Sequence, residues 1–264
     1  MAIKHKLLKD INEHERDKHI VFRERGHVYY VKRQSGYKSV TTLVHNCFEK
    51  FNADKIIEYM MNSDNWTESK YYGMTREEIK TMWKKNGQDA AKMGTAMHAM
   101  FEYYYNKIKQ DVIDSYHGTK EHEYFMNFVN DHQDLIPYRT EWNVYHEDYK
   151  IAGSIDMLFI NDDGTISIYD WKRCKAIERR NNFGKKCLVP ELTHISDTNF
   201  WHYSFQLNMY KFILEDKYDL TVKDMYLVVI HPDNELNNYE KMPVPNMQKE
   251  IGILLSHHSK IQGL

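Results

Sequence analysis

Residues 141–175 restrict the fold of this chain more than any other stretch. The segment reads EWNVYHEDYKIAGSIDMLFINDDGTISIYDWKRCK and predicts three consecutive strands, at 141–146, 151–160 and 165–171. A short turn joins the first two strands, and a turn of the D-D-G type at 161–164 joins the second and third. The second and third strands are apolar apart from a few charged residues. The sequence therefore predicts a sheet built around this stretch.

The charged residues of these strands predict a metal site. Asp156 lies in AGSIDMLFI, where Gly153 allows close backbone approach, and Asp170 lies near the end of ISIYDWK. Pairing through the turn can bring the two aspartates side by side, which is unfavourable unless a cation lies between them. Carboxylate oxygens suit Mg²⁺ or Mn²⁺. Lys172 projects from the same strand face as Asp170, whereas the Trp171 side chain points away and leaves its carbonyl to face the metal.

A predicted helix upstream adds two residues of metal-ligand type. A T-x-x-E capping box at 75–78 marks a helix start, and the Asn-Gly pair at 86–87 is expected to end that helix. A second, longer helix is then expected at 88–109. In it His98 and Glu102 are four residues apart, so they are neighbours on one face.

The remaining elements predict an α/β protein, in which helices pack against a mixed sheet. In chain order they are a hairpin at 19–31, helices after Ser39 and at 53–61, helices at 119–134 and 200–215, a buried strand at 225–231 and a closing helix at 246–257.

Composition excludes several classes of protein. The net charge of −2 argues against bulk electrostatic coating of nucleic acid, although it allows a local basic groove. No run approaches the roughly 18 apolar residues of a membrane span, and the first residues lack the features of a secretory signal. Three cysteines cannot supply the four thiolates of an iron–sulfur cluster, and their spacing predicts free thiols in a reducing, intracellular compartment, either the cytoplasm or, for a viral or phage protein, the host cell. They are Cys47, Cys174 and Cys187.

Four short motifs occur in a fixed order along the chain. They are G-T-x-x-H at 94–98, G-x-x-D at 153–156, D-x-K at 170–172 and Q-x-x-x-Y at 206–210. This combination closely resembles the RecB-like branch of the PD-(D/E)xK nucleases, which includes the nuclease domains of RecB and AddB, the CRISPR-associated Cas-four family and the mitochondrial genome maintenance exonuclease. The resemblance covers residues 88–210. It implies a restriction-endonuclease-like fold, with a nuclease core at 76–264 behind an N-terminal hairpin and helical accessory lobe at 1–75.

The resemblance also implies a role for each motif residue. Lys172 would be the catalytic lysine, acting with Asp156 and Asp170. The metal ligands would be His98, Asp156, Asp170 and the carbonyl of Trp171. Gln206 and Tyr210 would line the site and orient the substrate. Glu102 would hold a second metal or a metal-bound water, or would be a surface carboxylate with neither role.

The segment after the catalytic lysine is strongly basic and lies directly beside the predicted site. We expect it to form a flap that contacts phosphates, because phosphate contacts come mainly from Lys and Arg side chains. Its candidate substrate-binding residues are Arg173, Lys175, Arg179 and Arg180. Among the other histidines, His202 lies one helical turn before Gln206 and is the best further candidate for a substrate contact.

The resemblance implies an Mg²⁺- or Mn²⁺-dependent deoxyribonuclease, by analogy an exonuclease, that serves DNA repair, recombination or replication. Two alternatives remain open: a nucleic-acid-binding module without catalysis, and an RNA endonuclease with the same fold. The chain lacks the flanking cysteines of cluster-bearing relatives and has no helicase motif of the G-x-x-x-x-G-K-[ST] type. A cooperating helicase, recombinase or single-strand-binding protein would therefore be a separate chain, and no membrane partner is expected.

Overall fold

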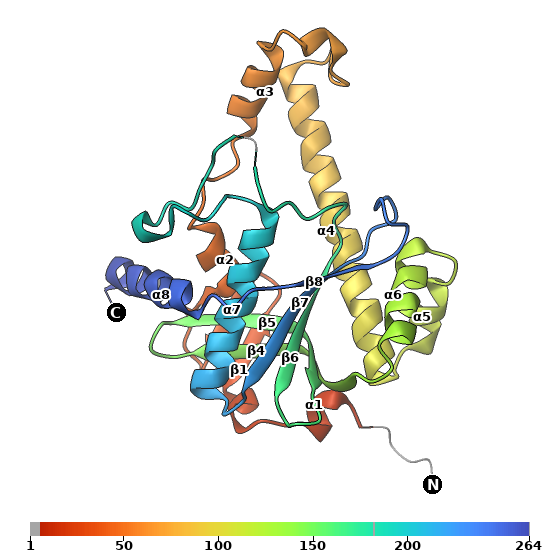
Figure 1. Cartoon of the computed structure of the whole chain (residues 1–264), viewed down its shortest axis with the longest axis vertical. Helices are drawn as coiled ribbons and strands as arrows, with labels where there is room; N and C mark the ends of the chain where they lie inside the picture. The colour runs from red at the N-terminus through yellow and green to blue at the C-terminus, as the bar shows by residue number, and fades with distance from the viewer. Residues whose placement is uncertain (1–5, 182, 264) are drawn as a thin grey trace.

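The computed structural model describes residues 6–181 and 183–263 (Figure 1). A six-stranded mixed sheet forms its centre, and a separate two-stranded hairpin accompanies it. The sheet consists of β3 (Lys38–Ser39), β4 (Ile136–His146), β5 (Ile151–Ile160), β6 (Ile166–Lys172), β7 (Val222–Val229) and β8 (Glu240–Pro243). The predicted α/β fold of restriction-endonuclease type, a central mixed sheet flanked by helices, is confirmed.

Strand β5 is the element on which the sheet is assembled. Along one edge β4 pairs antiparallel with its whole length. On the other edge β6 pairs antiparallel with residues 157–160, and β3 pairs parallel with residues 151–152. Among the described strands none pairs with residues 153–156 on this second edge. After Tyr169, the partner of Met157, β6 leaves β5 and continues beside β7, to which it is parallel. The sheet therefore splits between β5 and β6.

Helices cover both faces of the sheet (Figure 1). One face carries α2 (Val40–His45), α7 (Asn199–Lys217) and α8 (Gln248–Gln262), and the other carries α4 (Arg76–Asn106) and α6 (Lys120–Asp131). Short helices at α1 (Leu8–Ile11), α3 (Ala53–Met61) and α5 (Gln110–Ser115), with three 3-10 turns, complete the described elements.

Side-chain alternation along β5 and β6 divides the core into two layers. Leu158 and Ile168 belong to the layer under α7, while Phe159 and Trp171 pack into an aromatic layer with Phe101 and other rings of α4 and α6. The Trp171 side chain therefore points away from the α7 side, as predicted. The neighbouring positions 170 and 172 share the parity of Ile168 and face α7.

The predicted break at 86–87 is wrong, because α4 is one continuous helix of 31 residues. Its start is the predicted capping box, in which Thr75 and Glu78 each bond the other's backbone N–H. One glycine inside a helix costs only about 1 kcal/mol, which a helix of this length offsets easily. The helix length of about 46 Å carries its N-terminal half beyond the sheet, where α3 lies beside it (Figure 1).

The predicted hairpin at 19–31 is confirmed by β1 (Ile20–Arg23) and β2 (Val28–Val31), which pair antiparallel. The predicted boundary at residue 75 stays a prediction. Residues before it also contribute to the sheet and its cover, since β3 pairs with β5 and α2 packs against α7. Of the helices in the described part of the chain, none combines the length and apolar character needed to cross a bilayer.

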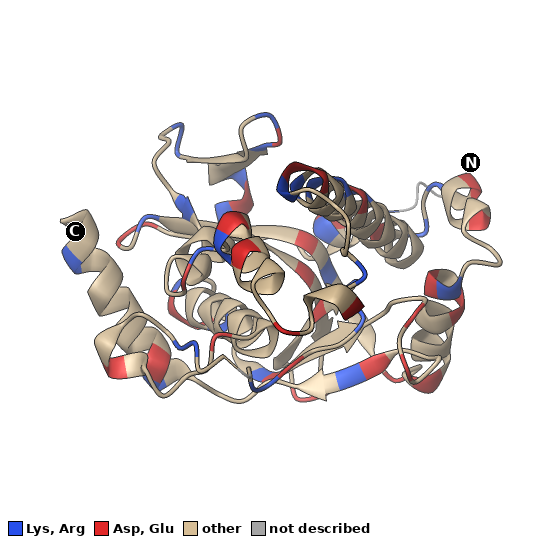
Figure 2. Ribbon diagram, turned by 90° about the horizontal axis from the view of Figure 1, so that it is seen from above, with Lys and Arg blue, Asp and Glu red and all other residues tan. Residues whose placement is uncertain are grey.

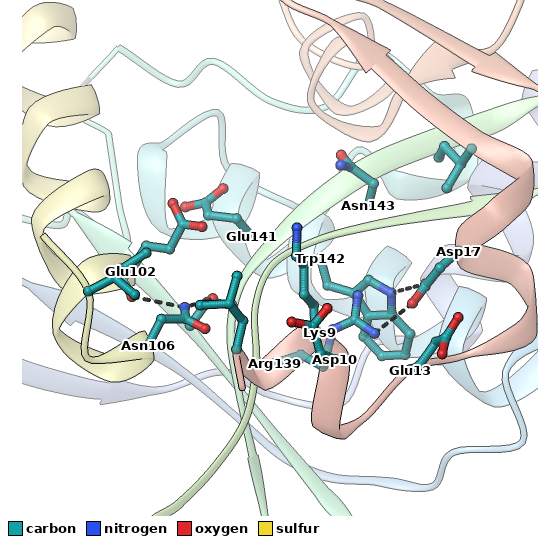
Figure 3. Close-up of a pocket in the computed structure, with 14 residues that line it drawn as sticks. Lys9, Asp10, Glu13, Asp17, Glu102, Asn106, Arg139, Glu141, Trp142 and Asn143 are labelled. Carbon is teal, nitrogen blue, oxygen red and sulfur yellow. Dashed lines mark hydrogen bonds and ion pairs between the residues drawn. The ribbon is translucent and has the colours of Figure 1, made fainter. Parts of the chain in front are cut away.

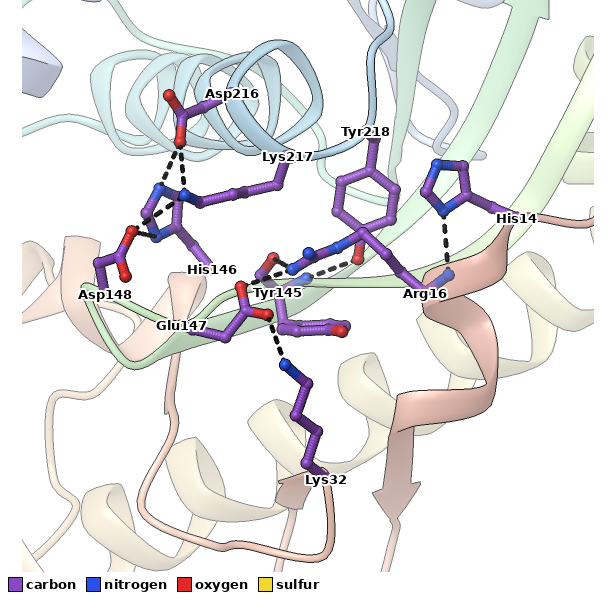
Figure 4. A network of polar contacts seen from close by, with 10 residues as sticks. All are labelled: His14, Arg16, Lys32, Tyr145, His146, Glu147, Asp148, Asp216, Lys217 and Tyr218. Carbon is purple, nitrogen blue, oxygen red and sulfur yellow. Dashed lines mark hydrogen bonds and ion pairs between the residues drawn. The ribbon is translucent and has the colours of Figure 1, made fainter.

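A polar network ties the N-terminal segment to the β4–β5 turn (Figure 4). The guanidinium of Arg16 lies over the Tyr145 ring, 4.1 Å from its centroid, and donates to the Glu147 carboxylate at 2.6 Å. Lys32 approaches the other oxygen of Glu147 at 3.3 Å. Burial opposes ionisation of Glu147, but the hydrogen bonds to its carboxylate and the charge of Arg16 together outweigh burial and lower its pKa to about 2.

We predict that Glu147→Gln lowers the free energy of unfolding by about 1 kcal/mol at neutral pH. The folded-state pKa is depressed, so the stabilisation is present above the usual value of 4.5 and is lost as pH falls from there towards 2. Urea titrations of both proteins between pH 7 and pH 3 measure this. A difference in midpoint that stays constant over the range contradicts the assignment.

Candidate functional site

The candidate site lies where β5 and β6 part. Here the Asp156 carboxylate accepts the backbone N–H of Trp171 at 2.9 Å, so a side chain replaces the missing ladder bond between the strands. The carbonyl of the same residue lies 3.0 Å from Nε2 of His98, on α4. Because a carbonyl can only accept, Nε2 carries the hydrogen and the other ring nitrogen of His98 faces away from Trp171.

Three potential ligand atoms converge beside this bond. Nδ1 of His98 lies 3.5 Å from Oε1 of Glu141 and 3.6 Å from Oδ2 of Asp156. The three atoms all lie within 4.8 Å of one another. An imidazole held by a backbone carbonyl through its other nitrogen is the usual form of a metal-binding histidine.

Sequence reasoning missed Glu141, although the signal was present. The antiparallel register pairs Thr140 with Met157 and Trp142 with Ile155, which places Glu141 opposite Asp156 across β4 and β5. Glu141 has a φ of 43°, in the left-handed region that residues other than glycine seldom adopt. Such strain is found most often at functional sites.

The local electrostatics favour a positive charge among these groups. Burial by itself would lower the pKa of His98, but the carboxylates of Asp156 and Glu141 outweigh burial and raise it to about 9. Burial raises the pKa of Asp156, against the opposing charges of His98 and Lys172. Without a cation the imidazole supplies the positive charge that the two carboxylates need.

Asp170 and Lys172 form a buried ion pair on the α7 side of the sheet. Oδ2 of Asp170 and Nζ of Lys172 are 2.5 Å apart, and the two side chains are 2% and 15% exposed. The ammonium also lies over the Tyr203 ring of α7, 4.6 Å from its centroid. Burial opposes the charge on Lys172, yet the carboxylates of Asp170 and Asp156 raise its pKa above the ordinary value. Lys172 is therefore held as a cation.

The motif residues of α7 complete the wall of this cavity. Gln206 lies one turn from Tyr210 and donates a long bond of 3.4 Å to its hydroxyl. A cavity of about 300 Å³ is lined by both residues together with Asp156 and Lys172. His202 also lines the cavity, where its Nε2 lies 2.8 Å from Oδ1 of Asp197.

Gly153 has the close backbone approach that the sequence predicted. A Cβ placed there would lie 2.7 Å from a ring carbon of Tyr210 and 2.9 Å from its hydroxyl oxygen. The tyrosine ring therefore occupies the space beside the unpaired stretch of β5, where a side chain would otherwise project.

Glu102, on α4, lies beside Glu141. Figure 3 shows the two carboxylates directed towards each other at the edge of a neighbouring cavity of about 490 Å³. Burial, and then the charge of Glu141, raises the pKa of Glu102. The arrangement leaves both predicted readings of Glu102 open, so its role stays a prediction.

The basic segment after Lys172 is partly neutralised by neighbouring carboxylates. Arg173 donates twice to Glu121 and its side chain is 8% exposed, and Lys175 pairs with Asp233 at 2.8 Å. The Arg179 guanidinium lies over the Phe200 ring, and Arg180 is exposed. None of the four lines the 300 Å³ cavity described above. Their role in substrate binding stays a prediction.

The donor set suits a small divalent cation. One imidazole and two carboxylates match the mixed nitrogen and oxygen coordination of such ions. Of the other predicted ligands, Asp170 pairs with Lys172, and the Trp171 carbonyl accepts a bond from the imidazole. Two half-buried carboxylates held this close repel each other unless a cation lies between them. The residues present therefore fit a bound Mg²⁺ or Mn²⁺.

Comparisons with known proteins give distant similarities. No family model matches the chain, and no curated protein matches its sequence. Among solved structures the chain is similar to a candidate exonuclease from Eubacterium rectale, with 13% identity over 66% of each chain and a TM-score of 0.43. It is also similar to the protein SSO0001, with 15% identity over 62% of this chain and 70% of that one and a TM-score of 0.30. Both similarities are too distant to assign a function.

We predict opposite effects for two glycine substitutions. Gly153→Ala drives a methyl group into the Tyr210 ring and should destabilise the fold by about 1–3 kcal/mol. Gly87→Ala places a methyl group in open space inside α4 and should stabilise it by about 0.5–1 kcal/mol. Urea denaturation of the two variants beside the parent chain measures both effects. A stable Gly153→Ala protein would show that Tyr210 does not occupy this position.

Proposed function

We propose that this chain is a metal-dependent nuclease that hydrolyses phosphodiester bonds in DNA. The observation that supports this best is the convergence of His98, Glu141 and Asp156, with Lys172 held as a cation in the cavity that His98 and Asp156 also line. Hydrolysis of a phosphodiester requires groups that bind a metal and groups that stabilise developing negative charge. The carboxylates and the imidazole meet the first requirement, and the ammonium meets the second.

In this proposal the chain's own residues divide the chemistry between them. A bound Mg²⁺ or Mn²⁺ would polarise the phosphoryl oxygen and lower the pKa of a coordinated water. Nδ1 of His98 and the carboxylates of Asp156 and Glu141 would hold that ion. The Trp171 carbonyl, predicted as a ligand, instead accepts the bond from Nε2 and orients the imidazole. Ligation by Asp170, which pairs with Lys172, stays a prediction. Asp156 has a second task, since its bond to the Trp171 N–H fixes the spacing of β5 and β6.

Lys172 acts as a cation and not as a base. Its raised pKa keeps the ammonium protonated, so it donates hydrogen bonds and stabilises negative charge on the scissile phosphate or orients the attacking water. Attack in line would leave a 5′-phosphate and a 3′-hydroxyl, as the resemblance implies. Gln206 and Tyr210 would position the strand from the α7 side.

The finer parts of the proposal rest on the resemblance of the four motifs. They are action on DNA ends as an exonuclease of the Q-x-x-x-Y branch, a role in repair, recombination or replication, and a helicase, recombinase or single-strand-binding protein as a separate partner. Lys and Arg are interspersed with Asp and Glu along the chain (Figure 2), and the net charge is −2, so affinity for DNA must come from local basic regions. Phosphate contacts carry no sequence information, and weak sequence preference is expected.

We predict that end-labelled DNA is cleaved with Mg²⁺ or Mn²⁺ and stays intact in EDTA. Lys172→Ala should lower the rate by at least about a hundredfold, because one preorganised charge contributes that much to a transition state. The exposed Lys120→Ala on α6 serves as control and should cleave at the parent rate. Matched RNA and DNA substrates are compared in the same assay. Cleavage that persists in EDTA, or a Lys172→Ala protein with full activity, refutes the mechanism.

We also predict that Glu141 and His98 both contribute to metal affinity. Titration calorimetry with Mn²⁺ should show binding to the parent chain, and His98→Ala or Glu141→Gln should weaken it at least about tenfold. Glu123→Gln, on the exposed face of α6, should bind Mn²⁺ like the parent. If Glu141→Gln binds Mn²⁺ unchanged, Glu141 does not belong to the ligand set.

A further inference from the structure

The β1–β2 hairpin has two faces with different chemistry. Phe22 and Tyr29 are paired in the register, and their side chains line a cavity of about 640 Å³ that also contains His98 and Glu141. Val21 and Tyr30, the next pair, point to the opposite face because side chains alternate along a strand. One face of the hairpin therefore borders the candidate metal site, and the other faces away from it.

The outward face forms a second concavity, of about 530 Å³. Four cations line it, contributed by the segment before β1, by β1 itself and by the turn after β2. They are Lys18, Arg23, Lys32 and Arg33, with the Tyr30 ring and the exposed Val21 between them. The Arg23 guanidinium lies over the Tyr30 ring, 4.7 Å from its centroid. We call this concavity the hairpin groove.

The charge of the hairpin groove is largely uncompensated. No carboxylate lines it, and over residues 6–181 and 183–263 no acidic group lies within 4.0 Å of the cationic nitrogens of Lys18, Arg23 or Arg33. Lys32 shares Glu147 with Arg16, at 3.3 Å. Three cations without an ion pair therefore gather in one concavity, on a chain whose net charge is −2.

Two of these cations belong to residues whose backbone conformation is energetically unfavourable. Lys32 and Arg33 have φ values of 50° and 67°, so two successive residues other than glycine lie in the left-handed region. Each such residue costs on the order of 1 kcal/mol. The Lys32 N–H bond to the His19 carbonyl, at 2.7 Å, holds this turn against β1.

We propose that the hairpin groove is a second nucleic-acid site, which holds the phosphate backbone of a single strand outside the cleavage site. This rests on the proposed function. Uncompensated cations match the regularly spaced charges of a phosphate backbone, and the Tyr30 ring offers a stacking surface that tolerates any base. The hairpin groove and the 640 Å³ cavity beside His98 and Glu141 lie on opposite faces of the hairpin, whose thickness is on the order of 10 Å. A strand passing over the hairpin tip therefore reaches both.

The test is fluorescence anisotropy of a labelled oligothymidylate over a range of KCl concentrations in EDTA, where no hydrolysis is needed. For the double variant Arg23→Gln and Arg33→Gln, weaker binding is expected, and the slope of log affinity against log salt should fall by about 1.4, which is two phosphate contacts on a single strand. The matched control is Lys120→Gln with Lys249→Gln, two exposed cations on α6 and α8. It should bind with the parent's affinity and slope.

The outcomes separate this proposal from the proposed function. If the arginine variant binds with the parent's affinity and salt slope, the hairpin groove is not a nucleic-acid site, whether or not the chain cleaves DNA. If binding depends on the arginines but no metal supports cleavage, the groove stands and the nuclease assignment fails. Sedimentation with phosphatidylserine vesicles that requires the arginines, with DNA binding unchanged, overturns the nucleic-acid assignment.

Discussion

The hydrogen bond from the Trp171 N–H to the Asp156 carboxylate connects two strands that no longer pair. Up to Met157 and Tyr169, β5 and β6 share backbone bonds, and beyond them a single side chain spans the gap. This bond fixes Asp156 beside β6 and directs the carbonyl of Trp171 to His98. The Trp171 side chain, packed among aromatic rings on the other face, anchors β6 at the same residue. The geometry of the whole site therefore depends on Trp171, whose backbone is fixed by Asp156 and His98 and whose side chain is fixed by packing.

The split in the sheet also explains why so many charges can be buried there. Paired strands satisfy their own backbone groups and leave no room for a ligand, whereas parted strands expose N–H groups and carbonyls that charged side chains can use. Asp156 uses an N–H, His98 uses a carbonyl, and Lys172 lies against Asp170 within the same opening. Each anionic group has a cationic neighbour, and because a metal-binding imidazole must be neutral, loss of the extra proton of His98 would accompany the binding of a divalent ion.

Much of the fold follows from local sequence because its signals are local. The bounds of β5 and α3 match the predicted ranges, and the Thr75 capping box starts α4 as expected. The predicted break at Asn86 and Gly87 failed because weak helix formers lower the stability of a helix without ending it when strong neighbours continue on both sides. The split between β5 and β6 has no local signal. The split arises because β6 continues beside β7, and β7 lies fifty residues further along the chain.

Some residues of the candidate site follow from motif spacing in the sequence, whereas the positions of others depend on tertiary packing. Asp156, Lys172, Gln206 and Tyr210 meet in one cavity because each motif fixes the direction of its own side chain on a strand or helix. Glu141 could have been found by extending the register of the 147–150 turn, which places it opposite Asp156. No such arithmetic applies to Arg173, whose partner Glu121 lies on α6, fifty-two residues earlier in the chain. A run of basic residues therefore predicts positive charge in the sequence, and only the fold decides which of those charges remain unpaired and free for a phosphate.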